Sequence, residues 1–247
     1  MWETILFWLV VLLANIIQGV TGFAGTILAM PFSLMLVGYD TAVPILNALG
    51  MLSGIYVFVL NRKEVRWKEL GRIFIVMIPM IFVGLWLRRY LSQYGKLIYI
   101  LLGVLVLALA LSGSVKMILE EKRGTKETKA NPVLMVALLA ASGLVHGMFV
   151  CGGPLLISYL TRRVKESGAF RATISTVWIV LNGLILGSHI YEGMWTLETV
   201  KTGACTLPFL LAGMAIGGIL YKKMSRKVFM IITYVLLLIS GISLLVK

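Results

Sequence analysis

Apolar segments long enough to cross a membrane recur along the whole chain. They lie at about 41–60, 70–87, 97–118, 170–189 and 228–246, and a further one contains Pro208, Gly213 and Gly217. A helix needs roughly 20 apolar residues to span the hydrocarbon core of a bilayer. The chain is 60% hydrophobic and has 13% charged residues, whereas soluble domains have about 45–50% and about 25%. We therefore expect an all-α polytopic membrane protein.

Two pairs of apolar runs are too short to span. The first pair consists of residues 5–17 and 26–37, and the second pair consists of residues 132–145 and about 154–164. The first pair flanks the glycine-rich stretch QGVTGFAGT at 18–26, and the second flanks HGMFVCGGP at 146–154. Glycine allows sharp turns that other residues resist. The pattern predicts a broken or re-entrant short-helix pair in each half, with its break near the membrane midplane.

The two halves repeat this order of a short pair followed by three long transmembrane helices. At an offset of 128 residues Gln18 aligns with His146, Gly19 with Gly147 and Gly25 with Gly153, and at 129 Pro79 aligns with Pro208 and Gly84 with Gly213. If both short pairs are re-entrant, each half crosses three times, so the halves form inverted repeats, as in many secondary transporters. We predict a first membrane repeat at 1–118, a cytoplasmic linker at 119–131 and a second membrane repeat at 132–247.

The basic residues predict the orientation. Lys and Arg cluster between apolar runs, and an outside N-terminus places most of the 23 in cytoplasmic loops, as the positive-inside rule requires. We therefore expect a multi-pass protein of the cytoplasmic membrane with both termini outside. Arg88, Arg89 and Lys96 are exceptions on the outer side, where His189 is expected at the interface. The start of the chain lacks a basic n-region, so we expect the mature first helix there and no signal peptide.

Composition also argues against several classes of function. The net charge of +13 follows from the loop charges, and no basic–aromatic module indicates nucleic acid. Cys151 and Cys205 are too few for a disulfide framework or a metal cluster. We expect no metal, no cofactor and no catalytic residues. An enzyme acting on a lipid phosphate would need acid–base residues and an arginine clamp at the breaks, which offer one histidine.

The breaks have the chemistry of an anion site. A helix that starts at membrane depth leaves free N–H groups, and these together with the helix dipole favour negative charge. No charged residue lies well inside an apolar run, so we expect neutral donors and helix ends to hold the anion, with no fixed positive charge nearby. The candidate residues are Gln18, Gly19, Thr21, Gly22, Phe23, Gly25, Thr26, Asn47, His146, Gly147, Phe149, Gly152, Gly153, Pro154, Thr176 and Asn182.

Simpler roles exist for the same residues. The glycines allow close helix packing, and Asn47, Thr176 and Asn182 can bridge helices. Arg171 is expected to anchor the topology, although it could attract anions. His146 is the only ionisable group expected near the midplane. It could carry a coupling proton, because its reference pKa is about 6.5. We favour a neutral histidine that donates one hydrogen bond, and the coupling ion, a proton or another cation, stays open.

Three stretches resemble one family. QGVTGFAGTILAMP at 18–31, HGMFVCGGPLL at 146–156 and AFRAT at 169–173 are similar to the TauE/SafE sulfite exporter family, also called the 4-toluene sulfonate uptake permease family. The resemblance covers essentially the whole chain. It implies transport of sulfite, organosulfonates, sulfoacetate-like compounds or related small organic anions.

We accordingly expect a secondary transporter that moves a small anionic substrate across the lipid bilayer by alternating access around both breaks. An anion channel with the same site is the main alternative, and the lipid-phosphate enzyme is a weaker one. The sequence leaves open the substrate, the direction of transport and whether the protein forms a homo-oligomer.

Overall fold

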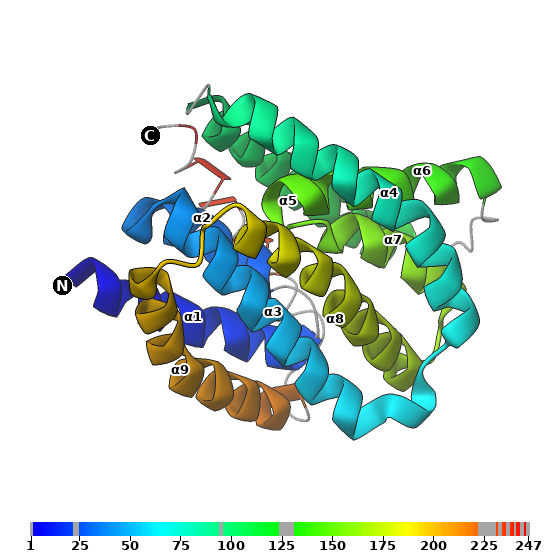
Figure 1. Cartoon of the computed structure of the whole chain (residues 1–247). Helices are drawn as coiled ribbons and strands as arrows, with labels where there is room; N and C mark the ends of the chain where they lie inside the picture. The colour runs from blue at the N-terminus through cyan, green and yellow to red at the C-terminus, as the bar shows by residue number, and fades with distance from the viewer. Residues whose placement is uncertain are drawn as a thin grey trace.

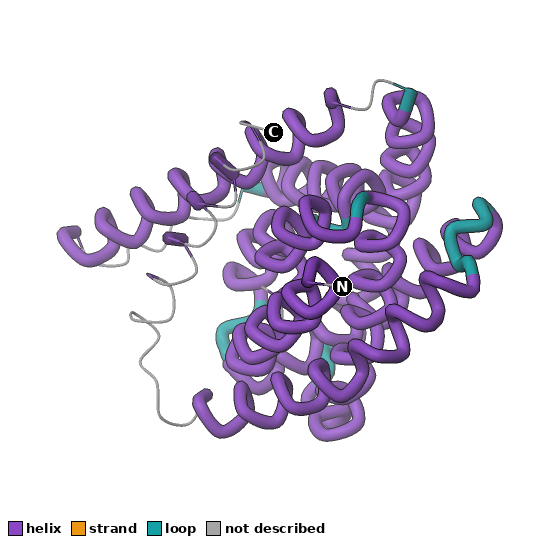
Figure 2. The backbone as a smooth tube through the Cα atoms, turned by 90° about the vertical axis from the view of Figure 1, so that its left-hand side faces the viewer, coloured by secondary structure: helices purple, strands orange, loops and turns teal. Residues whose placement is uncertain are grey.

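Helices account for nearly all of the backbone in the computed structural model of the protein, which describes residues 2–21, 25–93, 96–123, 131–221 and eight scattered positions from 231 to 245. Figure 2 shows how short the described non-helical segments are. The helices are α1 (Trp2–Thr21), α2 (Gly25–Val37), α3 (Tyr39–Asn61), α4 (Trp67–Ser92), α5 (Lys96–Arg123), α6 (Pro132–Phe149), α7 (Gly153–Arg163), α8 (Ser167–Tyr191) and α9 (Leu197–Tyr221), with a 3₁₀ turn at Arg62–Glu64.

The all-α membrane architecture is confirmed. Six helices, α1, α3, α4, α6, α8 and α9, are long and apolar enough to cross a bilayer. Large apolar side chains on their outer faces are exposed, among them Ile75, Trp86 and Leu211, as expected where lipid replaces water. The helix expected at 228–246 lies mostly outside the described residues.

The two helix pairs differ from expectation in their first members. α2 and α7 are short, with 13 and 11 residues, as predicted. In contrast, α1 has 20 residues and α6 has 18, enough to cross. The helices continue through Gly19 and Gly147, since glycine is tolerated inside membrane helices. The breaks are therefore shorter than the glycine-rich stretches, and the second one comprises only Val150, Cys151 and Gly152.

The helices pack in a reciprocal pattern. α1 packs against α9, α6 packs against α4, and α3 packs against α8. Figure 1 shows α3 and α8 running alongside each other through the bundle. If α1 corresponds to α6 and α4 to α9, the first two contacts are equivalent and the third pairs a helix with its own counterpart. Two-fold-related halves would pack in this way, but their inverted orientation and the repeat boundaries stay predictions.

Two glycine–glycine contacts correct the alignment of the repeats. A Cβ added to Gly19 would lie 3.0 Å from Cα of Gly217, and one added to Gly84 would lie 3.0 Å from Cα of Gly147. Because Gly19 corresponds to Gly147, Gly84 corresponds to Gly217 and not to Gly213. The sequence alignment of α4 with α9 is wrong by four residues, about one helical turn.

A buried ion pair joins α4 to the end of α8. Arg88 is 4% exposed and pairs with Glu192, which also bonds to Arg89 at 3.2 Å. His189 is fully buried, and its Nε2 lies 3.2 Å from Nη1 of Arg88. His189 thus lies near the end of α8 but is packed inside the protein, and its place at the membrane interface stays a prediction. Arg88 does not follow the positive-inside rule. Glu192 neutralises its charge inside the protein, so Arg88 does not act as a topology signal.

Close packing at Gly217 makes its substitution costly. We expect Gly217→Ala to destabilise the protein by about 1–3 kcal/mol, because overpacked interfaces must shift; the added Cβ would lie 2.8 Å from Cα of Gly19. Gly218 is the matched control, since its Cβ would meet open space. Thermal unfolding in detergent should show a lower Tm for Gly217→Ala alone. Equal Tm changes in both variants would contradict the close contact.

The Glu192 ion pair predicts a pH dependence of stability. Partial burial raises the pKa of the Glu192 carboxyl, but Arg88, Ser188 and Arg89 together lower it below its usual value. A lowered folded-state pKa stabilises the protein above the unfolded value, about 4.3 for glutamate, and this contribution is lost as the pH falls through the folded value. We expect the Tm of wild type to exceed that of Glu192→Gln by a constant amount above about pH 5, and the gap to narrow below about pH 4.

Glu166→Gln provides the control for this pH series. Glu166 pairs with Arg66, but its side chain is 71% exposed, and exposed pairs contribute little. Its Tm should follow that of wild type at every pH. A Glu192→Gln gap that keeps the same size down to pH 3 would show that the carboxylate charge is not the source of the stability.

Candidate functional site

Gln18 joins the end of α1 to the start of α2. Its Oε1 accepts a hydrogen bond from the backbone N–H of Gly25 at 2.7 Å, and its Nε2 donates to Oγ of Ser53 at 3.1 Å. The side chain is buried, with 5% exposed. The first N–H group of a helix has no partner within the helix, and in a membrane such a group must be satisfied by the protein. Gln18 performs this role for α2 and ties the break to α3.

His146 occupies the corresponding position in the second half. Its Nε2 lies 2.9 Å from Oδ1 of Asn182, and Nδ2 of Asn47 donates to the backbone oxygen of Asn182 at 2.9 Å. Asn182 lies at the predicted offset of 129 from Ser53. Each half thus uses the same contact, in which the polar residue near the end of the first helix bonds to a polar residue on the third. The chemistry differs, because the first half uses an amide and a hydroxyl and the second an imidazole and an amide.

The second break contains a strained residue. Val150 ends α6 with a φ of 56°, and its N–H donates to the backbone oxygen of His146 at 2.8 Å. This left-handed conformation commonly ends helices, but glycine usually adopts it. A β-branched residue there is an outlier, at a cost of about 1–3 kcal/mol. Such strain clusters at functional sites, and Val150 lines the cavity described below.

The glycines that follow the breaks pack against the helix ends. A Cβ on Gly25 would lie 2.8 Å from Cβ of Gln18, and a Cβ on Gly152 would lie 2.8 Å from Cβ of His146. In both halves the second helix begins four residues after the first one ends, at Gly25 after Thr21 and at Gly153 after Phe149. The helix starts therefore keep the predicted offset of 128, although in the second half the glycine just before the helix start makes the contact with the preceding helix.

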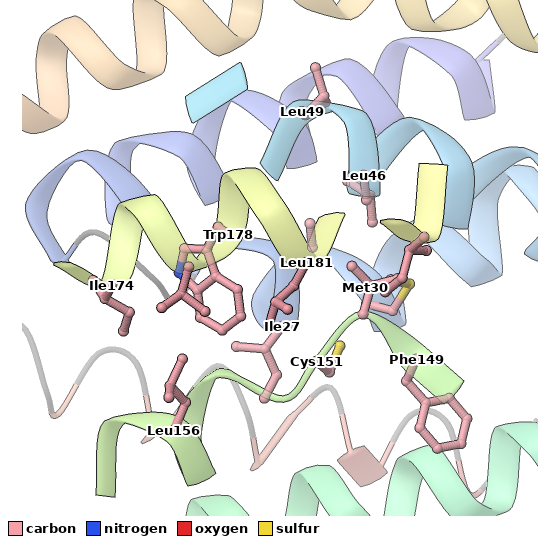
Figure 3. Close-up of a cluster of buried hydrophobic side chains, with 14 of the residues drawn as sticks. Ile27, Met30, Leu46, Leu49, Phe149, Cys151, Leu156, Ile174, Trp178 and Leu181 are labelled. Atoms are coloured by element: carbon pink, nitrogen blue, oxygen red, sulfur yellow. The ribbon is translucent and has the colours of Figure 1, made fainter. Parts of the chain in front are cut away.

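A small buried cavity lies between the two breaks. It has a volume of about 20 Å³, room for about one water molecule. Figure 3 shows Ile27, Cys151 and Trp178 of its lining, which lie close together between α2, α8 and the segment that carries Cys151. The lining comprises Gln18, Thr26, Ile27, Gly50, His146, Val150, Cys151, Gly153, Trp178 and Asn182. A second cavity of about 10 Å³ adjoins it, since both touch Gln18, Thr26 and Gly50.

Two polar ring atoms of the lining residues have no hydrogen-bond partner within the described part of the chain. They are Nδ1 of His146 and Nε1 of Trp178, and the two rings lie 5.1 Å apart between centroids. The indole N–H can only donate. Leaving such a group buried without a partner costs about 1–3 kcal/mol. Trp178 therefore brings an unused donor to the wall of the cavity, where the atom itself is buried.

A fixed positive charge lies beside the first break, contrary to expectation. Nη2 of Arg171, near the start of α8, donates to the backbone oxygen of Gly19 at 3.1 Å. The carbonyl groups at the end of a helix carry partial negative charge, which a guanidinium stabilises. A matching contact occurs at the second break, where the hydroxyl of Tyr39 donates to the backbone oxygen of Met148 at 3.1 Å. Each helix end is thus held by the start of a long helix from the other half.

The structure brings together some of the predicted site residues. Gln18, Thr26, His146, Gly153 and Asn182 line the main cavity, and Gly25 lines the second. Gly152 adjoins His146, and Asn47 reaches the cavity through Asn182.

Other predicted residues have structural roles. Gly19 and Gly147 mediate helix packing, and Pro154 opens α7. Thr176 bonds to the backbone oxygen of Ala172 in its own helix, and Phe149 packs in the apolar core. Gly22 and Phe23 lie outside the described residues, as does the side chain of Thr21.

Sequence analysis missed Ser53, Cys151 and Trp178. The offset of 129 from Asn182 would have found Ser53, and Cys151 lies within the second glycine-rich stretch. Trp178 gives no comparable signal, since an aromatic residue in an apolar helix is ordinary.

Comparisons with known proteins identify the family of the chain. The family model described as "Sulfite exporter TauE/SafE" matches residues 7–244. The "Probable inner membrane transporter protein TsaS" of Comamonas testosteroni is 28% identical over 189 residues, which cover 75% of this chain and 74% of that protein. No solved structure matches. The match over nearly the whole length shows that the chain belongs to the TauE/SafE sulfite exporter family of membrane transporters.

Proposed function

We propose that the protein is a secondary transporter that moves a small sulfur-containing anion, such as sulfite, an organosulfonate or a sulfoacetate-like compound, across the cytoplasmic membrane by alternating access. The cavity between the two breaks is the proposed binding site. The observation that carries this assignment is the meeting of both breaks at one buried cavity with an unpartnered indole N–H among its lining residues. The family match supports the substrate class, and the TsaS relative supports transport across a membrane.

The site fits an oxyanion through neutral groups. The start of α7 contributes the positive end of a helix dipole, Trp178 offers an N–H donor, and Thr26 offers a hydroxyl. Arg171 of α8, which bonds to the end of α1, adds a positive charge that attracts anions toward the first break. Neutral donors bind an anion less tightly than a buried guanidinium would, which suits a site that must also release its ligand.

The size of the cavity favours a transporter over a channel. Space for about one water molecule cannot hold a sulfonate, so the halves must move apart to admit it. Contacts between the halves, such as Asn47 with Asn182 and Arg171 with Gly19, would break and re-form in such a movement. Saturable uptake that depends on a counter-ion would exclude the channel.

His146 offers a means of proton coupling. Its Nε2 faces Oδ1 of Asn182, so a neutral ring that donates there leaves Nδ1 as an acceptor. Protonation turns Nδ1 into a donor and places a positive charge beside the bound anion. Anion and proton would then bind together, whereas a neutral His146 would serve only to hold Asn182. We infer proton coupling through His146, and the pH response of His146→Gln tests it.

Loss of the polar cavity residues should reduce transport. We expect Gln18→Ala, His146→Ala and Asn182→Ala to lower sulfite or methanesulfonate flux into proteoliposomes by about tenfold to a hundredfold. A hydrogen bond to a charged group contributes about 1.5–3 kcal/mol, and 1.4 kcal/mol is a factor of ten. His146→Gln should in addition remove any acceleration by a proton gradient.

Asn61→Ala is the matched control for these variants. Asn61 donates a hydrogen bond to the backbone oxygen of Val57 in its own helix, and it does not line the cavity. Its flux should equal that of wild type. Wild-type flux in all three cavity variants would overturn the proposed site.

Bulk at the two breaks should also block transport. We expect Gly25→Leu and Gly152→Leu each to reduce flux at least about tenfold, because their side chains would displace Gln18 or His146 from its partner. Gly187→Leu on α8 is the control, since a Cβ there meets open space. Flux should be compared at equal amounts of folded protein, measured by size-exclusion chromatography. Normal flux in both break variants would contradict the assignment of the breaks to the transport path.

A further inference from the structure

The ion pair of Arg88 and Glu192 lies at one end of the bundle, away from Arg171. His189 and Arg171 are both on α8, 18 residues apart, which corresponds to about 27 Å along a helix. Arg171 holds the end of α1, whereas His189 contacts Arg88. The charge rule predicts that the Arg88 end faces the outside.

The pair joins the two halves and is connected to the cavity through other residues. Arg88 belongs to α4 in the first half, and Glu192 directly follows α8 in the second. Tyr39 interacts with Arg88, and its hydroxyl donates to the backbone oxygen of Met148. Met148 lies two residues before Val150, which lines the cavity. A continuous series of contacts therefore leads from the cavity to the ion pair.

Arg88 needs a negatively charged partner. A guanidinium stays charged at all relevant pH values, and burying it without an anion is strongly unfavourable. Glu192 supplies that anion in this structure, and its side chain is 18% exposed. The second arginine on Glu192, Arg89, has a side chain that is 62% exposed. An anion arriving from that end meets exposed Arg89 first. It then competes with the Glu192 carboxylate for Arg88. Sulfite and sulfonates present the same kind of acceptor oxygens as a carboxylate.

We propose that Arg88 and Glu192 form the outer gate of the transport path, and that an incoming oxyanion displaces Glu192 from Arg88 as the gate opens. Arg88 is then an entry site for the substrate, separate from the midplane cavity. This inference rests on the proposed transport function, but both of its tests measure the gate without measuring flux.

Cys151 provides a native reporter for the gate. The chain has two cysteines, of which Cys151 is buried in the cavity lining and Cys205 is exposed on α9. Cys205→Ser therefore leaves one cysteine, whose reaction with a membrane-impermeant methanethiosulfonate reagent reports access to the cavity. Right-side-out and inside-out vesicles distinguish the two faces.

Removal of the carboxylate charge should open the outer path. In the Cys205→Ser background, we expect Glu192→Gln to raise the labelling rate of Cys151 at least about tenfold from the outside and not from the inside. Glu192→Asp keeps the charge on a shorter side chain and should give an intermediate rate. Glu166→Gln removes an exposed pair and should leave the rate unchanged. No rise, an equal rise on both faces, or a rise only from the inside would overturn the outer gate.

Added anion should replace the missing carboxylate. We expect methanesulfonate, compared with chloride at equal ionic strength, to raise the Tm of Glu192→Gln more than that of wild type. The double variant Arg88→Met/Glu192→Gln should show only the wild-type shift, because binding at the midplane cavity is common to all three proteins. Equal shifts in all three would show that Arg88 is not an entry site. If no sulfite or methanesulfonate flux is measured but both of these results are obtained, the proposed substrate is wrong and the proposed gate is supported.

Discussion

Backbone N–H and C=O groups inside a membrane cannot form hydrogen bonds with water. The contacts at the two helix breaks meet this constraint. Gln18 satisfies the first N–H group of α2. In the second break the hydroxyl of Ser142 donates to the backbone oxygen of Gly152 at 2.7 Å. The helix ends before the breaks are held by Arg171 and Tyr39. Irregular backbone is therefore tolerated because side chains from both halves complete its hydrogen bonds.

Each break is coupled to the other half of the chain, because a side chain from that half binds the helix end in front of the break. Arg171 reaches α1 from α8, and Tyr39 reaches α6 from α3. A relative movement of the halves changes the environment of both helix ends at once. Packed interfaces of this kind tend to have discrete arrangements and deform little between them. The breaks, the cavity and the contacts of the proposed gate would then move together, although Gln18 and His146 give the two breaks different chemistry.

Much of this fold follows from patterns that a sequence preserves. Apolar length predicts the spanning helices, and glycine-rich stretches between short runs locate both breaks to within a few residues. The alignment of Gly84 was wrong because the same helix face recurs after about 3.6 residues, so Gly213 and Gly217 are equally good matches until their neighbours are known. The extent of α1 was missed because Gly19 looks like a helix breaker, while in the structure it packs against Gly217.

The contacts of Arg171 and Arg88 could not be predicted from the sequence, for a different reason. Arg171 and Arg88 both lie near the ends of apolar segments, where sequence patterns assign arginine to the membrane surface. A long side chain can instead reach inward when a helix end or a carboxylate meets it. Arg171 meets the carbonyl end of α1, and Arg88 meets Glu192. These partners come from the other half of the chain, more than 100 positions away, so only the packing of the halves reveals them. Arg171 lies near the start of α8, and Arg88 of α4 contacts His189 near the end of α8, so each end of the proposed path has one arginine bound to the opposite half. In the proposed transport cycle, an anion entering from either end is attracted to the same contact that opens to admit it.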